Sequence, residues 1–279
     1  MPNNENDVDQ SLSHDHHLSL RQVELSDYKN IAAIMDRVYS TWGGAWDYSQ
    51  FQTMLRIFPE GQVCIVDNDV VVAAAFSVIV DYDQYGDKHT YDQITGNAHL
   101  TTHNPKGDVL YGVDVFVDPD YRDMRLGRRL YEARKEMCRN LNLRAIVAGG
   151  RIPGYNKHSE EMSPHQYIEK VSKKELYDPI LTFQLSNDFK VKRLLRNYLP
   201  EDKASGGFAT LLQWNNIYYE EESQDIFLQR NKNVRVGIVQ WKMRTTKDLE
   251  DLMRDVEFFV DALSDYKSDF VLFPEFFNA

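Results

Sequence analysis

The stretch that decides the fold runs from Tyr111 to Leu143 and reads YGVDVFVDPDYRDMRLGRRLYEARKEMCRNLNL. Its first part, 111–117, is rich in β-branched and aromatic residues and indicates a strand buried on both faces. The sequence 118–120, Asp-Pro-Asp, ends that strand. From Leu126 onward, apolar residues recur every three or four positions, which predicts a helix. The opposite helix face carries Arg128, Arg129, Glu132, Lys135, Glu136 and Arg139.

The turn between this strand and this helix concentrates positive charge. Arg122, Arg125, Arg128 and Arg129 lie close together in a chain whose net charge is -11. Free amides at a helix N-terminus attract anions, and arginine side chains can bind phosphate oxygens through two hydrogen bonds. The sequence therefore predicts an anion site at this turn.

Composition excludes several classes of protein. The strongly negative charge argues against a general nucleic-acid binder. Cys64 and Cys138 are the only cysteines, and their apolar contexts favour free thiols in a reducing compartment. No apolar run reaches membrane-spanning length. We therefore expect a cytoplasmic protein with no metal site and no nucleic-acid or membrane partner.

The chain of 279 residues allows two modest domains. Residues 1–17 are polar and acidic and predict a disordered tail, and 216–232 is a charged linker. Between them, 18–215 predicts an α/β domain, a mixed sheet flanked by helices, with strands at 62–66, 70–80, 109–117, 144–148, 189–199 and 208–214. The last part, 233–279, predicts a β-α-β unit with parallel strands and a helix capped by Thr245.

The stretch 117–130 resembles motif A of the GNAT superfamily of acyl-CoA N-acyltransferases. Arg122 and Gly127 match the motif Gln/Arg-x-x-Gly-x-Gly/Ala, whereas Arg125 stands where the family usually has its first glycine. The resemblance implies that acetyl-CoA is the acyl donor and that strands 109–117 and 144–148 part to admit its pantetheine arm. It places the CoA-binding residues at Val115, Val117, Arg122, Asp123, Met124, Arg125, Leu126, Gly127 and Arg128.

Two residues near the expected strand split are candidates for catalysis. Asp114 lies in the buried strand, where desolvation would raise its pKa toward that of a useful base, although a structural salt bridge to an arginine is an alternative. The resemblance puts Gly149 to Tyr155 beside the thioester, which makes Tyr155 a candidate acid for the leaving thiolate. An ordinary buried aromatic is the alternative for Tyr155.

The last part of the chain resembles the start of the carbon-nitrogen hydrolase (nitrilase) superfamily. The stretches 236–240 and 269–275 match the family's first two strands, with Glu275 at the position of its general base. The family combines this glutamate with a lysine and a nucleophilic cysteine, and neither residue type follows Glu275 in this sequence. The resemblance implies the first β-α-β unit of a nitrilase-like α/β sandwich, truncated, in the front part of a longer protein.

The order of the two parts resembles a known fusion of a GNAT domain with a nitrilase-like amidase. Two functions follow from it. In the first, 18–215 acetylates a small amine, and the longer protein supplies the lysine and the cysteine that act with Glu275 in amide hydrolysis. The hydrolase domain would also form the contacts of a homo-oligomer. In the second, 18–215 only binds acyl-CoA or acts as a scaffold that regulates the hydrolase.

Overall fold

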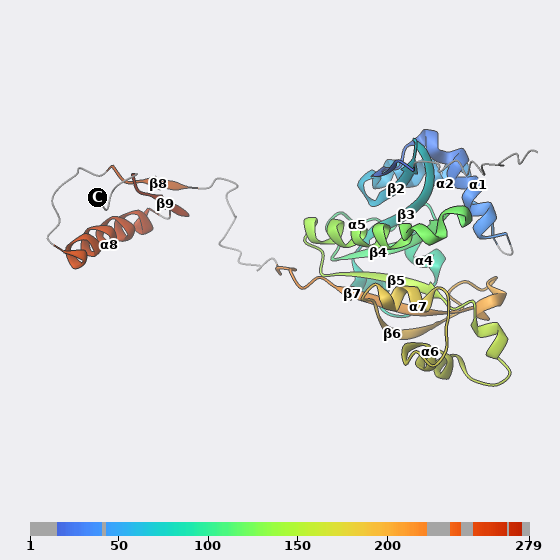
Figure 1. The fold of residues 1–279 in the computed structure, drawn as a ribbon. Helices are drawn as coiled ribbons and strands as arrows, with labels where there is room; N and C mark the ends of the chain where they lie inside the picture. Colours follow the sequence, from blue (N-terminus) through green and yellow to red (C-terminus); the bar gives the residue numbers. More distant parts are fainter. Residues whose placement is uncertain (1–15, 41–42, 222–234, 241–247, 267, 275–279) are drawn as a thin grey trace, which may run out of the picture. The chain divides into compact units, whose positions relative to one another are not determined.

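The computed structural model describes residues 16–40, 43–221, 235–240, 248–266 and 268–274. Contacts between residues divide the chain into two units, Met1–Glu220 and Glu221–Ala279. The first unit is built on a seven-stranded sheet in the order β1-β2-β3-β4-β5-β7-β6 (Figure 1). Its strands are β1 (Leu18–Gln22), β2 (Gln62–Asp67), β3 (Val70–Val80), β4 (Val109–Val117), β5 (Ala145–Arg151), β6 (Lys190–Arg196) and β7 (Phe208–Asn215).

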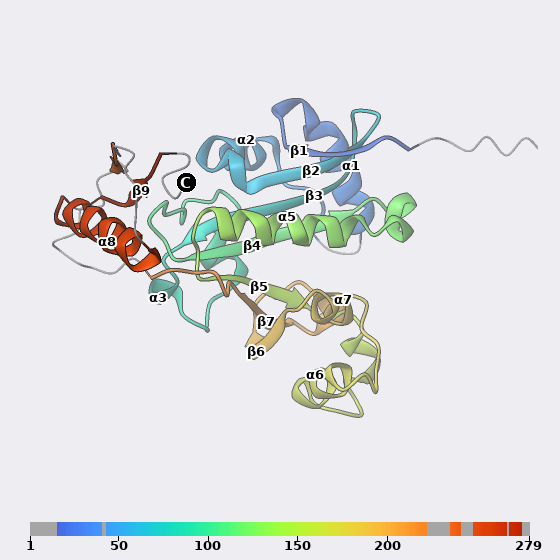
Figure 2. The ribbon, with the colours of Figure 1, turned by 60° about the vertical axis from the view of Figure 1, so that its left-hand side comes forward.

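Two layers of helices cover this sheet. They are α1 (Tyr28–Val38), α2 (Tyr48–Ile57), α3 (Tyr82–Tyr85), α4 (Tyr91–Thr95), α5 (Leu126–Asn140), α6 (Pro164–Ser172) and α7 (Leu181–Ser186). Alternation along β3 separates the layers, because Ala74 and Phe76 pack with α1 and α2 whereas Ala73 and Ala75 pack with α5. Figure 2 shows α5 running along the sheet over β3 and β4.

One pair of neighbouring strands in the centre of this sheet is parallel. β4 and β5 run parallel, whereas the other neighbouring strands run antiparallel. The prediction of a mixed sheet flanked by helices is confirmed, and the helix expected from Leu126 is α5. Both cysteines are free and buried, and burial raises the pKa of each thiol to about 12.

The second unit, taken by itself, holds β8 (Val236–Ile238), α8 (Leu249–Asp265) and β9 (Phe270–Leu272). β8 and β9 pair in parallel, as the sequence predicts. The helix is capped by Asp248, whose side chain accepts a hydrogen bond from the Asp251 amide, so the expectation of a Thr245 cap was wrong. Thr245 itself lies outside the described residues.

One further expectation needs correction. Lys135 does not lie on an exposed face of α5: it is 2% exposed, pairs with Glu132 and Asp188, and lies over the Trp214 ring. An aromatic neighbour and two carboxylates make burial of this lysine tolerable. In the segment predicted as a tail, His16 Nδ1 lies 2.6 Å from an Asp67 oxygen.

Candidate active site at the split between β4 and β5

The two parallel strands pair only over part of their length. Val109 to Gly112 on β4 pair with Ala145 to Ala148 on β5, and the pairing ends there. Beyond that point β5 continues against β7, and β4 continues against β3. The edges of β4 and β5 that face each other therefore part, with Val115 and Val117 on one side and Gly149 and Gly150 on the other.

A β-bulge in β4 marks the start of the split. Ser77 pairs with Gly112 and Phe76 with Asp114, so Val113 is an extra residue on β4. Because the bulge shifts the alternation by one residue, Asp114 and Phe116 share a face with Tyr111. Asp114 is thereby aimed toward the α1 and α2 side at the split.

Arg134 of α5 stabilises this bulge from the opposite face. Its guanidinium donates hydrogen bonds to the carbonyls of Phe76 and Asp114, at 2.9 and 2.8 Å, and to the Ser77 hydroxyl at 3.0 Å. The side chain is 3% exposed, and burial lowers the pKa of its guanidinium. A buried cation thus binds the carbonyls around the bulge, a role that the sequence analysis missed.

The predicted anion turn lies after β4. Arg122, Asp123 and Met124 belong to a 3-10 turn (Pro119–Met124), and α5 begins at Leu126. Arg125 is the N-cap and makes no side-chain capping hydrogen bond. Its backbone is left-handed, with φ 57° and ψ 23°, which is a conformation that glycine adopts without strain. The chain therefore keeps the glycine conformation of the motif although arginine occupies the position.

The charge at this turn is available to a ligand. Within the described part of the chain, no ion pair involves Arg122, Arg125, Arg128 or Arg129. The last three line a surface pocket together with Leu20, Glu132, Ala133 and Glu136. Leu126 is fully buried beneath them and fixes the first turn of α5 on the sheet. Unpaired arginines around free helix amides suit a ligand with several phosphates.

The α7 side of the split contains an unsatisfied polar atom. Gln184 is 6% exposed, and its Oε1 is buried without a hydrogen-bond partner among the described residues. A Cβ on Gly150 would overlap the Gln184 amide, so this oxygen faces the backbone of β5 beyond the end of its pairing with β4. An unpaired buried acceptor costs free energy unless a ligand supplies a donor. The two amides of a pantetheine arm are suitable donors.

Asp114 is held by hydrogen bonds, and the charges of Arg134 and Arg151 also act on its carboxylate. Its Oδ1 accepts from the Tyr39 hydroxyl at 2.6 Å and from the Val115 amide at 2.7 Å. Arg134 contacts the carbonyl of Asp114, not its carboxylate. Burial raises the pKa of Asp114, and the two hydrogen bonds oppose that rise only in part. The structure thus places a carboxyl group with a raised pKa at the split.

Tyr155 lies in a different environment. It belongs to a 3-10 turn (Tyr155–His158) after β5, where its ring packs on Tyr167 and Phe208. Its hydroxyl donates to the Met162 carbonyl at 3.3 Å. Tyr198, which the sequence analysis did not single out, places its phenol group against Gly149 of β5, just past the pairing with β4. Glu275, the third proposed catalytic residue, lies outside the described residues.

Comparison with known proteins identifies the family. A model of the Acetyltransferase (GNAT) family matches residues 31–162. The Bacillus subtilis protein "Uncharacterized N-acetyltransferase YkwB" is 34% identical over 178 residues, which cover 64% of this chain and 78% of YkwB. The chain belongs to the GNAT acetyltransferase family.

A longer relative matches more of the chain. "Probable hydrolase YhcX" of Bacillus subtilis is 41% identical over 252 residues, which cover 90% of this chain and 49% of YhcX. The chain thus spans about half the length of YhcX. Because 252 residues exceed the first unit, this match extends into the second unit.

Solved structures show the same GNAT fold at lower identity. The loading GNATL domain of CurA from Lyngbya majuscula has a TM-score of 0.63 at 24% identity and covers 71% of this chain and 98% of that domain. The GphF GNAT-like decarboxylase in complex with isobutyryl-CoA has a TM-score of 0.57 at 19% identity and covers the same shares. No described helix of this GNAT protein is long and apolar enough to span a membrane. No described group of His, Cys, Asp and Glu side chains could hold a metal ion.

Proposed function

We propose that residues 18–215 transfer an acyl group, acetyl in the simplest case, from acyl-CoA to a small amine. The parted strands beside an unpaired cationic helix N-terminus carry this proposal. The arginines at 122–128 and the amides of α5 would bind the phosphates, while the backbone at Val115 and Val117 and the Gln184 oxygen would bind the pantetheine amides. Asp123, Met124, Leu126 and Gly127 would contribute backbone contacts to the same turn.

The acceptor amine is expected on the α1 and α2 side of the split, where Asp114 lies. An amine enters as an ammonium ion, so it must lose one proton before it can attack the thioester carbonyl. The Asp114 carboxylate, oriented by Tyr39, would attract the ammonium and take that proton. Tyr155 remains a candidate acid for the leaving thiolate, although its hydroxyl already donates to Met162.

A turnover assay separates acyl transfer from a binding or scaffolding role. Acetyl-CoA would be incubated with the 1–279 chain and, separately, with tyramine, spermidine, L-lysine and glucosamine, and free thiol would be measured with a chromogenic disulfide. Amine-dependent thiol release supports transfer. If the protein binds CoA but no amine causes thiol release from acetyl-CoA, the domain has a binding or scaffolding role.

Arg122→Ala is expected to weaken CoA binding about tenfold, because each charge-assisted hydrogen bond contributes about 1.5–3 kcal/mol. Gly127→Asp should weaken it further, since a carboxylate would then stand at the helix N-terminus beside the phosphates. Isothermal titration with CoA measures both effects. Unchanged affinity in both variants would rule out this turn as the phosphate site.

Two matched variants serve as controls for that titration. Arg139→Ala removes an exposed arginine from the other end of α5, over the Trp214 ring, and should leave CoA affinity unchanged. Arg125→Gly keeps the left-handed backbone and should raise stability by about 1 kcal/mol. Its CoA affinity then measures what the Arg125 side chain itself contributes.

We further infer that the second unit is the start of a carbon-nitrogen hydrolase domain. The match to YhcX extends into it, and its strands pair in parallel as that resemblance requires. Apolar side chains remain exposed on both strands and on α8, for example Ile238 at 75%, Phe258 at 67% and Phe270 at 62%. Such faces fit a sheet that needs further elements to cover it. Assembly of oligomers through this domain and a cytoplasmic location remain predictions.

The 1–279 chain is expected to hydrolyse no amide, because the sequence after Glu275 supplies neither a lysine nor a cysteine. Ammonia release from a set of short amides measures this. Turnover that disappears in Glu275→Gln would contradict the prediction and reveal another nucleophile. Reading the gene beyond codon 279 is a direct test of the hydrolase inference, which requires a lysine and a cysteine in nitrilase-like contexts.

A further inference from the structure

We propose that His89 accepts a proton from the reacting amine through Tyr198 and Tyr111 and returns it to the departing CoA thiolate. The three side chains form a continuous hydrogen-bonded chain: His89 Nε2 lies 2.9 Å from the Tyr111 hydroxyl, which lies 2.8 Å from the Tyr198 hydroxyl. The proposal rests on the acyl-transfer function proposed above. It assigns that site a second proton acceptor besides Asp114.

The direction of these hydrogen bonds follows from the tautomer of His89, the last member of the hydrogen-bonded network. His89 Nδ1 lies 2.8 Å from the Gly86 carbonyl, which can only accept, so Nδ1 carries the proton in the neutral ring. His89 Nε2 is then an acceptor, and Tyr111 donates to it. Tyr198 in turn donates to Tyr111. All donors in this network point toward His89, so the Tyr198 oxygen can act as a hydrogen-bond acceptor on its outer side.

Tyr198 reaches the point where β4 and β5 part. A Cβ on Gly149 would overlap the ring and hydroxyl of Tyr198, so this phenol lies directly on β5 just past its pairing with β4. The Gly149 backbone also forms a hydrogen bond that lowers the pKa of Tyr198, against a larger rise from burial. Tyr111, which is hydrogen-bonded to Tyr198, and Asp114 both belong to β4, and the bulge puts them on one face of the sheet. The outer end of the relay and the Asp114 carboxyl group therefore lie on the same face of the sheet, beside the end of the β4–β5 pairing.

The relay is enclosed, which favours transfer along it over exchange with solvent. His89, Tyr111 and Tyr198 are 4%, 0% and 2% exposed. Tyr111 is anchored on β4, Tyr198 follows β6, and His89 comes from the segment between α3 and α4. Three segments that are far apart in the sequence thus form one proton path, and no local sequence motif predicts it.

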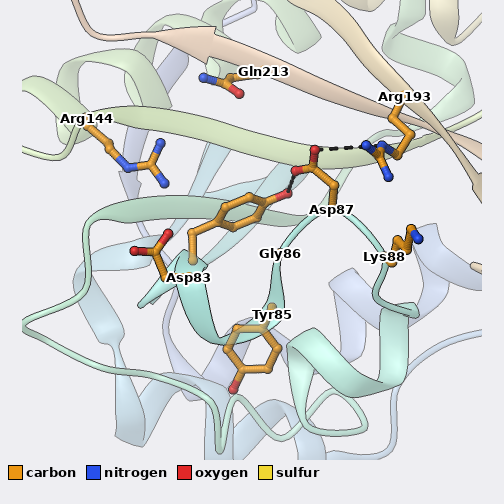
Figure 3. Close-up of a pocket in the computed structure, with 9 residues that line it drawn as sticks. Asp83, Tyr85, Gly86, Asp87, Lys88, Arg144, Arg193 and Gln213 are labelled. Atoms are coloured by element: carbon orange, nitrogen blue, oxygen red, sulfur yellow. Dashed lines mark hydrogen bonds and ion pairs between the residues drawn. The ribbon is translucent and has the colours of Figure 1, made fainter.

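Asp87 and the Gly86 carbonyl favour the charged form of His89, whereas burial opposes it. Gly86 and Asp87 line a surface pocket of about 560 Å³. Figure 3 shows Asp87 paired with Arg193, and the Asp87 carboxylate also accepts a hydrogen bond from the Tyr82 hydroxyl. Asp87 and the Gly86 carbonyl raise the pKa of His89, but burial lowers it more. Both arginines of the same pocket have acidic partners: Arg193 of β6 pairs with Asp87, and Arg144, before β5, lies over the Tyr82 ring and pairs with Asp108.

The protons balance over one turnover. After Asp114 has taken the first proton of the ammonium ion, the neutral amine attacks the thioester carbonyl and a C–N bond forms. The attached nitrogen, now positively charged, gives its proton to Tyr198, Tyr198 passes its own to Tyr111, and Tyr111 passes its own to His89 Nε2. When the C–S bond breaks, the same three transfers run backward and sulfur receives the proton. The amide and free CoA thiol are the products, and the Asp114 proton leaves to solvent.

The test uses His89→Gln and Tyr198→Phe in the 1–279 chain, with acetyl-CoA and the best amine of the panel. Both variants should lower kcat about a hundredfold or more, the usual contribution of positioned proton transfer. CoA affinity by titration should not change. In the wild type, kcat should fall as pH drops through the His89 pKa, which lies below the ordinary value of 6.5, and His89→Gln should lose that limb.

His103→Gln is the matched control. Burial also lowers the pKa of this histidine, but its ring stacks on Phe58 at 4.7 Å and its Nδ1 lacks a partner among the described residues. Its kcat and pH profile should match those of the wild type. If His89→Gln and His103→Gln behave alike, the relay is overturned while acyl transfer stands.

Chemical rescue separates proton transfer from packing. His89→Gly should regain activity with added imidazole but not with 1,2,4-triazole, which has a similar size and far lower basicity. Equal rescue by both would show that His89 only fills space and would overturn the proposal. Wild-type protein that binds CoA but turns over no amine would instead overturn the proposed function, and the relay with it.

Discussion

Arg134→Met is expected to lower the Tm of the first unit by roughly 10 °C, which corresponds to about 2–4 kcal/mol in a domain of this size. Methionine fills a similar volume but donates no hydrogen bond, so the carbonyls of Phe76 and Asp114 would lose their donor inside the protein. Each buried unsatisfied group costs about 1–3 kcal/mol. Thermal unfolding followed by circular dichroism measures the change.

Arg129→Met is the control for this experiment, because Arg129 is exposed on the same helix. Its free energy of unfolding should stay within about 0.5 kcal/mol of the wild-type value, so its Tm should change by no more than about 2 °C. Arg134→Lys should fall between the two, since one ammonium cannot reach both carbonyls in the planar geometry of a guanidinium. Equal stability of the Arg134→Met and Arg129→Met proteins would mean that water or a backbone shift replaces the guanidinium.

Arg134 also shows where sequence reasoning stops. The strand, turn and helix at 111–143 were predicted because their signals are local: apolar runs, a proline break and a period of three to four residues. Arg134 lies on the same helix as three exposed arginines, and nothing local distinguishes it from them. Its role depends on the bulge at Val113, which arises from pairing with β3 some forty residues earlier.

In the candidate site, too, the residues with a local sequence signal were predicted and the others were not. The anion turn could be predicted because its arginines and Gly127 are contiguous in the sequence, and Asp114 stood out as a carboxylate within an apolar strand. The relay could not be predicted from the sequence, because His89, Tyr111 and Tyr198 come from three separate segments. The available signal was weak: His89 lies in a long polar insertion, and such insertions often carry function. The position of Tyr198 depends on Gly149, whose missing side chain leaves space for the Tyr198 ring, and only the structure shows that contact.

The replacement of the motif glycine by Arg125 illustrates a different limit. A glycine at this position lets the backbone approach a pyrophosphate closely, and this sequence has arginine there instead. The structure shows the left-handed backbone that glycine would supply, with φ 57°. A non-glycine residue in this region costs about 1–2 kcal/mol. The surrounding fold, with Leu126 and Met124 packed beneath the turn, must therefore offset that cost.

Asp114→Asn is expected to lower kcat a hundredfold or more without loss of stability. Asparagine keeps the Oδ1 acceptor for the Tyr39 hydroxyl and the Val115 amide, at 2.6 and 2.7 Å in the wild type, so the local hydrogen bonds survive. It cannot take a proton from the entering ammonium, which removes a contribution of about 10²–10⁴ to the rate. Steady-state kinetics with acetyl-CoA and the panel amine measures the loss, and CoA titration should show unchanged affinity.

The stability of Asp114→Asn should depend on pH in a direction that identifies the cause. Burial raises the pKa of Asp114 above its ordinary value of 3.8, so the folded protein holds this proton over a range where the unfolded chain has lost it. As pH rises through the folded pKa, the wild type loses stability that the asparagine variant keeps. The Tm of Asp114→Asn relative to wild type should therefore increase from acid to neutral pH. Asp92→Asn, which removes an exposed carboxylate on α4, should show neither the kinetic loss nor this trend. A variant at Asp114 with full turnover would assign the carboxyl group a structural role and leave His89 as the proton acceptor to be tested first.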